Sequence, residues 1–121
     1  MAPGACSIQP KSADAWQNLA VALFLRQRFE EGITACEEAL KCDDKHVMAL
    51  FNMALAFERL KKYDKALATI RRALEIEPGD ISLQKLEFRV RLLKLRSKAL
   101  RMLKGLWPFN KRRRPALPPA I

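Results

Sequence analysis

Residues 13–46 read ADAWQNLAVALFLRQRFEEGITACEEALKCDDKH, and residues 47–80 read VMALFNMALAFERLKKYDKALATIRRALEIEPGD. The two segments align without a gap at an offset of 34 residues. Identical or similar residues meet along the alignment: Ala15 with Ala49, Asn18 with Asn52, Ala20 with Ala54, Ala22 with Ala56, Phe29 with Tyr63, Gly32 with Ala66, Ala39 with Ala73 and Leu40 with Leu74. A period of this length is typical of proteins built from stacked repeats. One structural unit therefore occurs twice and decides the fold.

Each unit has the pattern of two antiparallel helices joined by a polar turn. Large apolar residues recur at helical spacing in the first half of the first unit, as Trp16, Leu19 and Leu23 do. Small residues such as Ala39 and Ala73 let paired helices approach closely. The sequence predicts an all-α fold with helices over residues 13–26, 30–42, 47–60, 64–76 and 80–106.

The repeat resembles the tetratricopeptide repeat (TPR), which is a 34-residue pair of helices. The signature positions hold Trp16, Leu19, Ala20, Gly32 and Ala39 in the first unit, and Ala54, Phe57, Ala66, Ala73 and Pro78 in the second. The resemblance implies two repeats, 13–46 and 47–80, in a helical solenoid. We expect residues 1–12 to be a disordered N-terminus. Because about three repeats are usually needed for a stable solenoid, a short isoform, a truncated paralogue and a homodimer all stay open.

Residues 81–107 are expected to form a long C-terminal helix with two apolar faces. Leu83, Leu86, Val90 and Leu93 form one stripe, which would pack on the second repeat as a cap. A nearly opposite stripe contains Phe88, Leu92, Leu95, Ala99, Met102 and Leu106. This second stripe either folds back on the repeats, pairs with a second copy or meets another partner.

The charge of the chain is concentrated in this helix and in the segment after it. The net charge is +10, yet cations and carboxylates nearly balance up to Asp80. After Asp80 the sequence has one carboxylate residue, Glu87, and twelve cationic residues: Lys85, Arg89, Arg91, Lys94, Arg96, Lys98, Arg101, Lys104, Lys111, Arg112, Arg113 and Arg114. Residues 108–121 should form a flexible, basic and proline-rich tail. The asymmetry points to an acidic partner.

A long closing helix after such repeats resembles the C-terminal region of the large immunophilin co-chaperones of the cyclophilin and FK-drug-binding types. Asp80-Ile-Ser-Leu-Gln84 opens the helix and KGLWPF closes it, in the manner of that family. No counterpart of the family's isomerase domain is present in these residues, so the resemblance implies no prolyl-isomerase activity.

The first helices of the two repeats are expected to line a peptide groove, as the resemblance implies. The apolar groove residues are Val21, Phe24, Met48, Phe51 and Leu55, and the polar ones are Gln17, Asn18 and Asn52. These apolar side chains could bind an apolar peptide or could pack against an upstream helix.

The co-chaperones hold an acidic chaperone tail with a carboxylate clamp of lysine, asparagine and arginine side chains. If the two repeats correspond to the family's second and third, Asn18 matches the clamp asparagine. The clamp cations then fall on Met48 and Asn52, so strong capture of a chaperone tail is not expected.

The sequence offers little that points to enzymatic chemistry. Cys36, Cys42 and His46 are too widely spaced for a typical zinc site, which also needs a fourth ligand. His46, the only histidine, has no nucleophile suggested beside it. All four glycines are isolated, and no phosphate-binding loop is present. We therefore expect a non-enzymatic protein with no cofactor and no metal.

The leading hypothesis is a protein–protein interaction adaptor of the TPR co-chaperone type, which binds a chaperone or client peptide. The alternative is a module that binds calmodulin, a partner linked to the resembled family, or an anionic membrane surface. The contact residues would be Arg91, Lys94, Lys98, Arg101, Met102, Leu106 and Trp107, with the basic tail Lys111, Arg112, Arg113 and Arg114. Nucleic acid is a weaker prediction, because no recognition module accompanies the cations. With three cysteines and no visible secretory signal, we expect a cytoplasmic protein, and KRRRP could also direct it to the nucleus.

Overall fold

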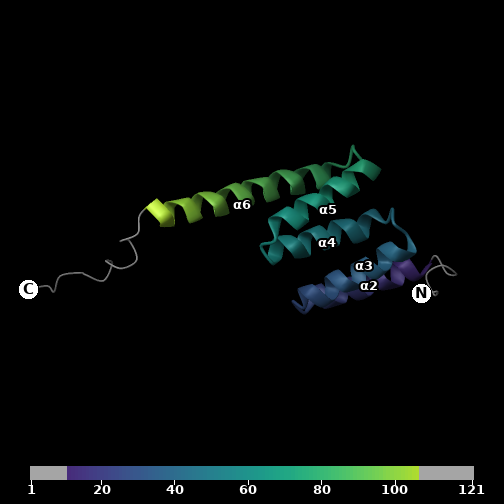
Figure 1. Ribbon diagram of the computed structural model, residues 1–121. Coiled ribbons are helices and arrows are strands. Elements are labelled where there is room, and N and C mark those ends of the chain that lie inside the picture. The colour runs from purple at the N-terminus through teal and green to yellow at the C-terminus, as the bar shows by residue number, and fades with distance from the viewer. Residues whose placement is uncertain (1–10, 107–121) are drawn as a thin grey trace, which may run out of the picture.

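The computed structural model describes residues 11–106, which form an all-α array of helical hairpins. The helices are α2 (Lys11–Leu25), α3 (Phe29–Cys42), α4 (Val47–Arg59), α5 (Tyr63–Ile76) and α6 (Ile81–Leu106). They stack in chain order, and α6 extends well past the ends of the other helices (Figure 1). The all-α fold predicted from the repeat is therefore confirmed.

Two antiparallel hairpins, α2–α3 and α4–α5, pack side by side. Besides the contacts between successive helices, the first helices of the two hairpins, α2 and α4, touch each other. This contact places α2 and α4 in one layer, with α3 and α5 behind them.

The core consists of small and branched side chains at the predicted helical spacing. Ala20, Ala39, Ala54 and Ala73 are completely buried, so the helix pairs approach closely at these positions. Leu50 and Ile70 are the large side chains that fill the interior beside them. Since the alanines recur at the 34-residue offset, the two hairpins pack by the same contacts.

The turn inside each hairpin is also repeated in its backbone geometry. Gln27 has φ 62° and Lys61 has φ 63°, both in the left-handed region, which is unusual for a residue other than glycine. The next amide closes the turn in each case: Arg28 N–H donates to Leu23 O at 2.9 Å, and Lys62 N–H donates to Phe57 O at 2.8 Å. Such a bond satisfies one of the free carbonyls at the helix end.

Helix α6 caps the second hairpin with the predicted apolar stripe. Leu83, Leu86 and Val90 are buried against α5, and Leu93 is half-buried. The amino end of α6 is capped by the side chain of Asp80, whose Oδ1 accepts from Leu83 N–H at 3.1 Å. The opposite stripe lies exposed, with Phe88, Leu92, Leu95 and Met102 all in contact with solvent.

The structure differs from the prediction at the amino end. Helix α2 begins at Lys11, so Lys11 and Ser12 are helical where a disordered segment through residue 12 was expected. The remainder of that segment, Trp107 and the tail 108–121 with Lys111 to Arg114 lie outside the described residues. None of the helices within residues 11–106 combines the length and the apolar character needed to cross a membrane.

Candidate functional site

One face of α4 carries half of the predicted groove residues. Met48, Phe51, Asn52, Leu55 and Arg59 recur every three or four positions, so they lie along a single stripe of the helix. We call this stripe, with the hollows at its two ends, the α4 groove. The hollows are lined by α2 at one end and by the start of α6 at the other.

The first hollow lies between α2 and α4 and has a volume of about 230 Å³. Val21, Phe24 and Leu25 line it from α2, and Asn52, Leu55 and Arg59 line it from α4. Leu25 is 80 % exposed and so presents apolar surface to solvent beside the hollow. This end of the groove therefore offers an apolar surface with one amide and one cation.

Two aromatic rings and Arg59 form the floor of that hollow. Phe24 stacks on Phe29 with ring centroids 6.2 Å apart. The guanidinium of Arg59 lies 5.3 Å from the centroid of Phe29, a cation–π contact. No carboxylate within residues 11–106 pairs with Arg59, so its hydrogen-bond donors can serve an arriving acceptor.

The second hollow lies between α4 and the start of α6 and has a volume of about 350 Å³. Met48 and Phe51 line it from α4, and Ser82 and Leu83 line it from α6. The acidic residues Glu77 and Asp80 complete its rim. The two ends of the α4 groove thus differ in charge, with a cation at one end and carboxylates at the other.

Glu58, beside the groove, is engaged by α6. Arg89 donates from Nη2 to Glu58 Oε1 at 2.6 Å and from Nε to Glu58 Oε2 at 3.1 Å. A two-point contact of this kind sets the orientation of both partners. It links α6 to α4.

The structure brings six of the eight predicted groove residues together and separates two. Val21, Phe24, Asn52 and Leu55 line the first hollow, and Met48 and Phe51 line the second. Gln17 is only 8 % exposed, so it belongs to the interior and not to the groove surface as predicted. Asn18 is exposed but lines neither hollow. Leu25 and Arg59 were missed, although both follow the helical spacing of the predicted residues.

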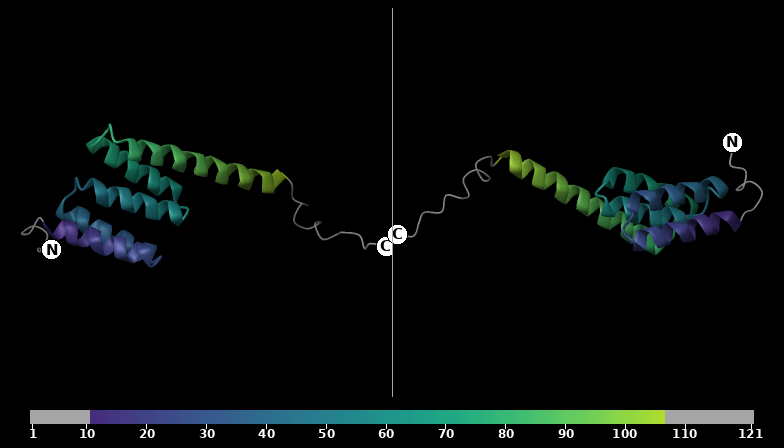
Figure 2. Two further views of the ribbon diagram at one scale, coloured as in Figure 1. Left: turned by 180° about the vertical axis from the view of Figure 1, so that it is seen from behind. Right: turned by 90° about the horizontal axis from the view of Figure 1, so that it is seen from below.

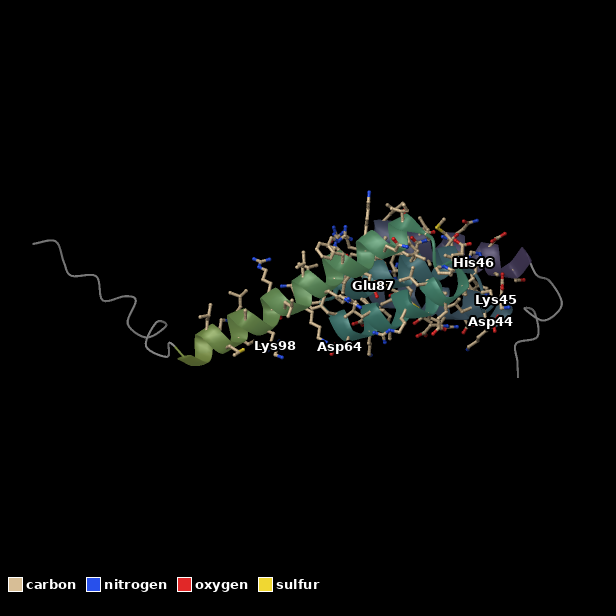
Figure 3. All side chains as sticks on the ribbon, turned by 90° about the horizontal axis from the view of Figure 1, so that it is seen from above. Asp44, Lys45, His46, Asp64, Glu87 and Lys98 are labelled. Carbon is tan, nitrogen blue, oxygen red and sulfur yellow. The ribbon has the colours of Figure 1, made fainter. Side chains whose placement is uncertain are left out.

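The predicted contact residues of the C-terminal helix are spread around α6. Arg91 pairs with Glu87 at 3.4 Å on its own helix, and Lys94 pairs with Asp64 of α5 at 2.6 Å. Lys98 and Met102 are exposed, and Arg101 contacts the Ser97 hydroxyl at 3.4 Å. Leu106 is the last residue of α6, and Trp107 lies outside the described residues. Figure 3 shows Lys98 on the projecting part of α6, far from His46.

The single histidine has a structural partner that the sequence did not suggest. His46 Nε2 lies 2.8 Å from Asp14 Oδ1, which joins the start of α2 to the start of α4. Its Nδ1 accepts from Ala49 N–H at 3.1 Å and caps α4. Because both ring nitrogens are used in this way, His46 links the two repeats and caps α4.

The remaining reactive groups do not form a site within residues 11–106. Burial and the neighbouring Glu37 carboxylate raise the pKa of the Cys36 thiol to about 12, so it is a poor nucleophile. No group of three metal-ligating side chains occurs in this part of the chain.

A family model described as "Tetratricopeptide repeat" matches residues 11–77. Human sperm-associated antigen 1 is 32 % identical over 105 residues, which are 86 % of this chain and 11 % of that protein. Human tetratricopeptide repeat protein 12 is 36 % identical over 63 residues, which are 52 % of this chain and 9 % of that protein. The chain thus spans about a tenth of the length of these curated relatives.

Two solved structures with similar sequences share the fold. The Arabidopsis OM64 TPR domain superposes with a TM-score of 0.63 at 32 % identity, over 65 % of each chain. The TPR2B domain of yeast Sti1, solved in complex with pHsp70, superposes with a TM-score of 0.62 at 27 % identity. That match covers 71 % of this chain and 74 % of the other.

Proposed function

Because the chain belongs to the tetratricopeptide repeat family, we propose that it is a non-enzymatic adaptor that binds an extended segment of a partner protein in the α4 groove. The observation that carries the proposal is the pair of hollows at the two ends of one helical stripe. TPR relatives are typically interaction modules and not enzymes.

The dimensions of the groove suit a short extended peptide. The stripe from Met48 to Arg59 covers eleven helical steps, or about 16 Å at 1.5 Å per residue. An extended peptide covers that distance with about five residues at roughly 3.3 Å each. Since successive side chains of an extended peptide point to opposite sides, alternate residues can fill the two hollows.

The lining of the groove indicates an apolar ligand with a polar end. Phe24, Leu55 and Phe51 provide apolar surface in the hollows, and Arg59 provides a donor for a carboxylate or carbonyl. The acidic rim at Glu77 and Asp80 would repel an anion. We therefore expect the peptide to carry apolar side chains and to place any carboxylate near Arg59.

The proposal is tested with a displayed library of random peptides selected against the folded chain. The affinity of the selected peptides is then measured for the double variant L25D/M48D, which places a negative charge in each hollow. Both residues are exposed, at 80 % and 55 %, so the double variant should fold. We expect at least a tenfold loss of affinity, because each substitution removes apolar contact surface and places a charge where an apolar side chain of the peptide should pack.

The matched control is L19D. Leu19 is a similarly apolar residue of α2, 46 % exposed, that lines neither hollow. The selected peptides should bind this variant as tightly as the unmodified chain. Equal binding to all three proteins would overturn the groove as the peptide site.

The finer proposal is a role of the co-chaperone type. It is supported by the likeness to the Sti1 TPR2B domain, which was solved in complex with pHsp70. Met48 and Asn52 stand where clamp cations were expected, and both lie in the hollows. A C-terminal chaperone peptide should therefore bind weakly, and micromolar affinity in a pull-down or titration would show that a clamp is not required. The closer likeness to the immunophilins stays a prediction.

A second candidate function uses the exposed stripe of α6. Phe88 is 65 % exposed, and Leu92, Leu95 and Met102 continue the apolar surface along the helix. Cationic side chains flank this apolar stripe, so the helix is of the kind that binds calcium-loaded calmodulin or an anionic bilayer. Calcium-dependent binding of the chain to calmodulin supports the first partner, and flotation with anionic but not neutral liposomes supports the second. Absence of both removes this candidate.

A further inference from the structure

Helix α6 continues beyond the amino end of α5 and forms an inner corner with the turn between α4 and α5 (Figures 1 and 2). We call this corner the α6 elbow. Two adjoining hollows of about 290 Å³ and 380 Å³ occupy it. They share Lys61, Tyr63, Ser97 and Arg101 in their linings, so together they form one concave region.

The elbow lies on the continuation of the face with which α6 packs on α5. Along this face the buried residues Leu83, Leu86 and Val90 are followed, at helical spacing, by Ser97, Arg101 and Lys104. The character of the face therefore changes from apolar to basic where α6 passes Tyr63. Packing of α6 on α5 as a cap accounts for the apolar part of this face. It does not account for the basic part.

Cations reach the elbow from two separate elements. The turn and first turn of α5 contribute Lys61, Lys62 and Lys65, and α6 contributes Arg96, Arg101 and Lys104. These residues are far apart in the sequence and come together only in the fold.

Few of these cations have an acidic partner. The carboxylate in the elbow is that of Asp64, which is engaged by Lys94 at 2.6 Å. The same lysine holds the pKa of that carboxyl below its usual value. Lys62 lies 3.9 Å from Glu30, a distant pair. Within residues 11–106, Lys61, Arg96 and Lys104 make no ion pair, and Arg101 contacts only a hydroxyl.

We propose that the α6 elbow binds a compact, multiply phosphorylated ligand of the inositol polyphosphate class, either free or as the headgroup of a phosphoinositide lipid. The guanidinium groups of Arg96 and Arg101 match the fork geometry of phosphate oxygens. The hydroxyls of Tyr63 and Ser97 add neutral donors. Phosphate groups carry nearly two charges each, which suits a small volume lined by several cations better than singly charged carboxylates do.

The size of the elbow supports a small ligand and not a flat surface contact. Its hollows reach the lower end of the range of small-molecule sites, which begins near 300 Å³. The amino end of α5 opens beside them, and its positive partial charge adds to the attraction for an anion. The elbow shares no residue with the α4 groove, so this proposal is independent of peptide binding.

The test is titration calorimetry of the chain with inositol hexakisphosphate at physiological ionic strength. The site variant K61A/R101A removes one cation from each element of the elbow. The control K85A/R72A removes the same charge from exposed positions of α6 and α5 that line neither hollow. We expect the site variant to bind at least about tenfold more weakly, since it removes two charge-assisted contacts to the ligand, and the control to change affinity less than threefold.

Vesicles distinguish the two sources of the ligand. Phosphatidylcholine vesicles that contain phosphatidylinositol bisphosphate are compared with phosphatidylserine vesicles of equal charge. Binding to the first alone, lost in K61A/R101A, identifies the lipid headgroup; binding of the soluble ligand alone identifies the free form. Equal losses in the two variants, tighter binding of a polyglutamate peptide, or no binding of inositol hexakisphosphate would overturn the proposal.

Discussion

Gly32 shows how a single residue shapes the groove. A methyl group added at Gly32 would clash with the ring of Phe24, whose Cδ1 would lie only 2.5 Å away. In the second repeat, Ala66 is the aligned equivalent of Gly32, and Glu58 is the aligned equivalent of Phe24. The glycine therefore makes room for an aromatic side chain that lines the first hollow.

We expect Gly32→Ala to destabilise the fold by about 1–2 kcal/mol, because overpacking costs about 1–3 kcal/mol and the gain in helix propensity returns up to about 1. Peptide affinity should fall as Phe24 moves. The measurement is urea unfolding followed by circular dichroism. Gly105→Ala is the control, since nothing lies within 4 Å of the added methyl there. A neutral or stabilising effect of Gly32→Ala would contradict the packing described.

The buried thiol of Cys36 should be unreactive in the folded protein. Its thiol is completely buried, and its pKa of about 12 keeps it protonated at all ordinary pH values. Since the thiolate is the reactive form, iodoacetamide at pH 8 should leave Cys36 unmodified in the folded protein and modify it in denaturant. Mass spectrometry of the peptide that contains Cys36 reads out the result. Rapid modification under native conditions would show that the α3 core opens readily.

At the scale of the element, α6 combines a structural half and an exposed half. Leu83, Leu86 and Val90 are buried, whereas the side chains of residues 94–104 are exposed or half-exposed. We expect Leu86→Ala to cost about 2–4 kcal/mol. A chain that ends after Lys98 should retain nearly all of its stability. Thermal unfolding measures the stability of the Leu86→Ala variant and of the shortened chain. A large loss of stability in the shortened chain would mean that the projecting half of α6 packs on the repeats.

How far the sequence predicted the structure also differs between elements. The 34-residue offset predicted the four helices of the two repeats to within two residues at each end, because small residues at fixed spacing report directly on helix contacts. The buried stripe of α6 was predicted from the helical spacing of its large apolar residues. Gln17 was misplaced, because a polar residue near the layer contact can be buried without any signal in its periodicity. The α6 elbow could not be predicted, since it depends on where α6 passes the α4–α5 turn.

At the scale of the whole molecule, two surfaces of different chemistry are placed apart. The α4 groove is largely apolar and lies between α2, α4 and the start of α6, while the α6 elbow is basic and lies where α6 leaves the repeats. His46 and Asp14 tie the first helices of the repeats together, and Arg89 and Glu58 tie α6 to α4. The groove is thus assembled from three helices whose relative positions are held by side-chain contacts.

The central claim, that the α4 groove binds an extended peptide, is tested most directly by mapping amide chemical shifts of the labelled chain during titration with a library-selected peptide. We expect the largest shifts at Leu25, Met48, Asn52, Leu55 and Ser82, with little change on the outer sides of α3 and α5. Shifts confined to α3 and α5, or to the projecting half of α6, would contradict the groove as the binding site.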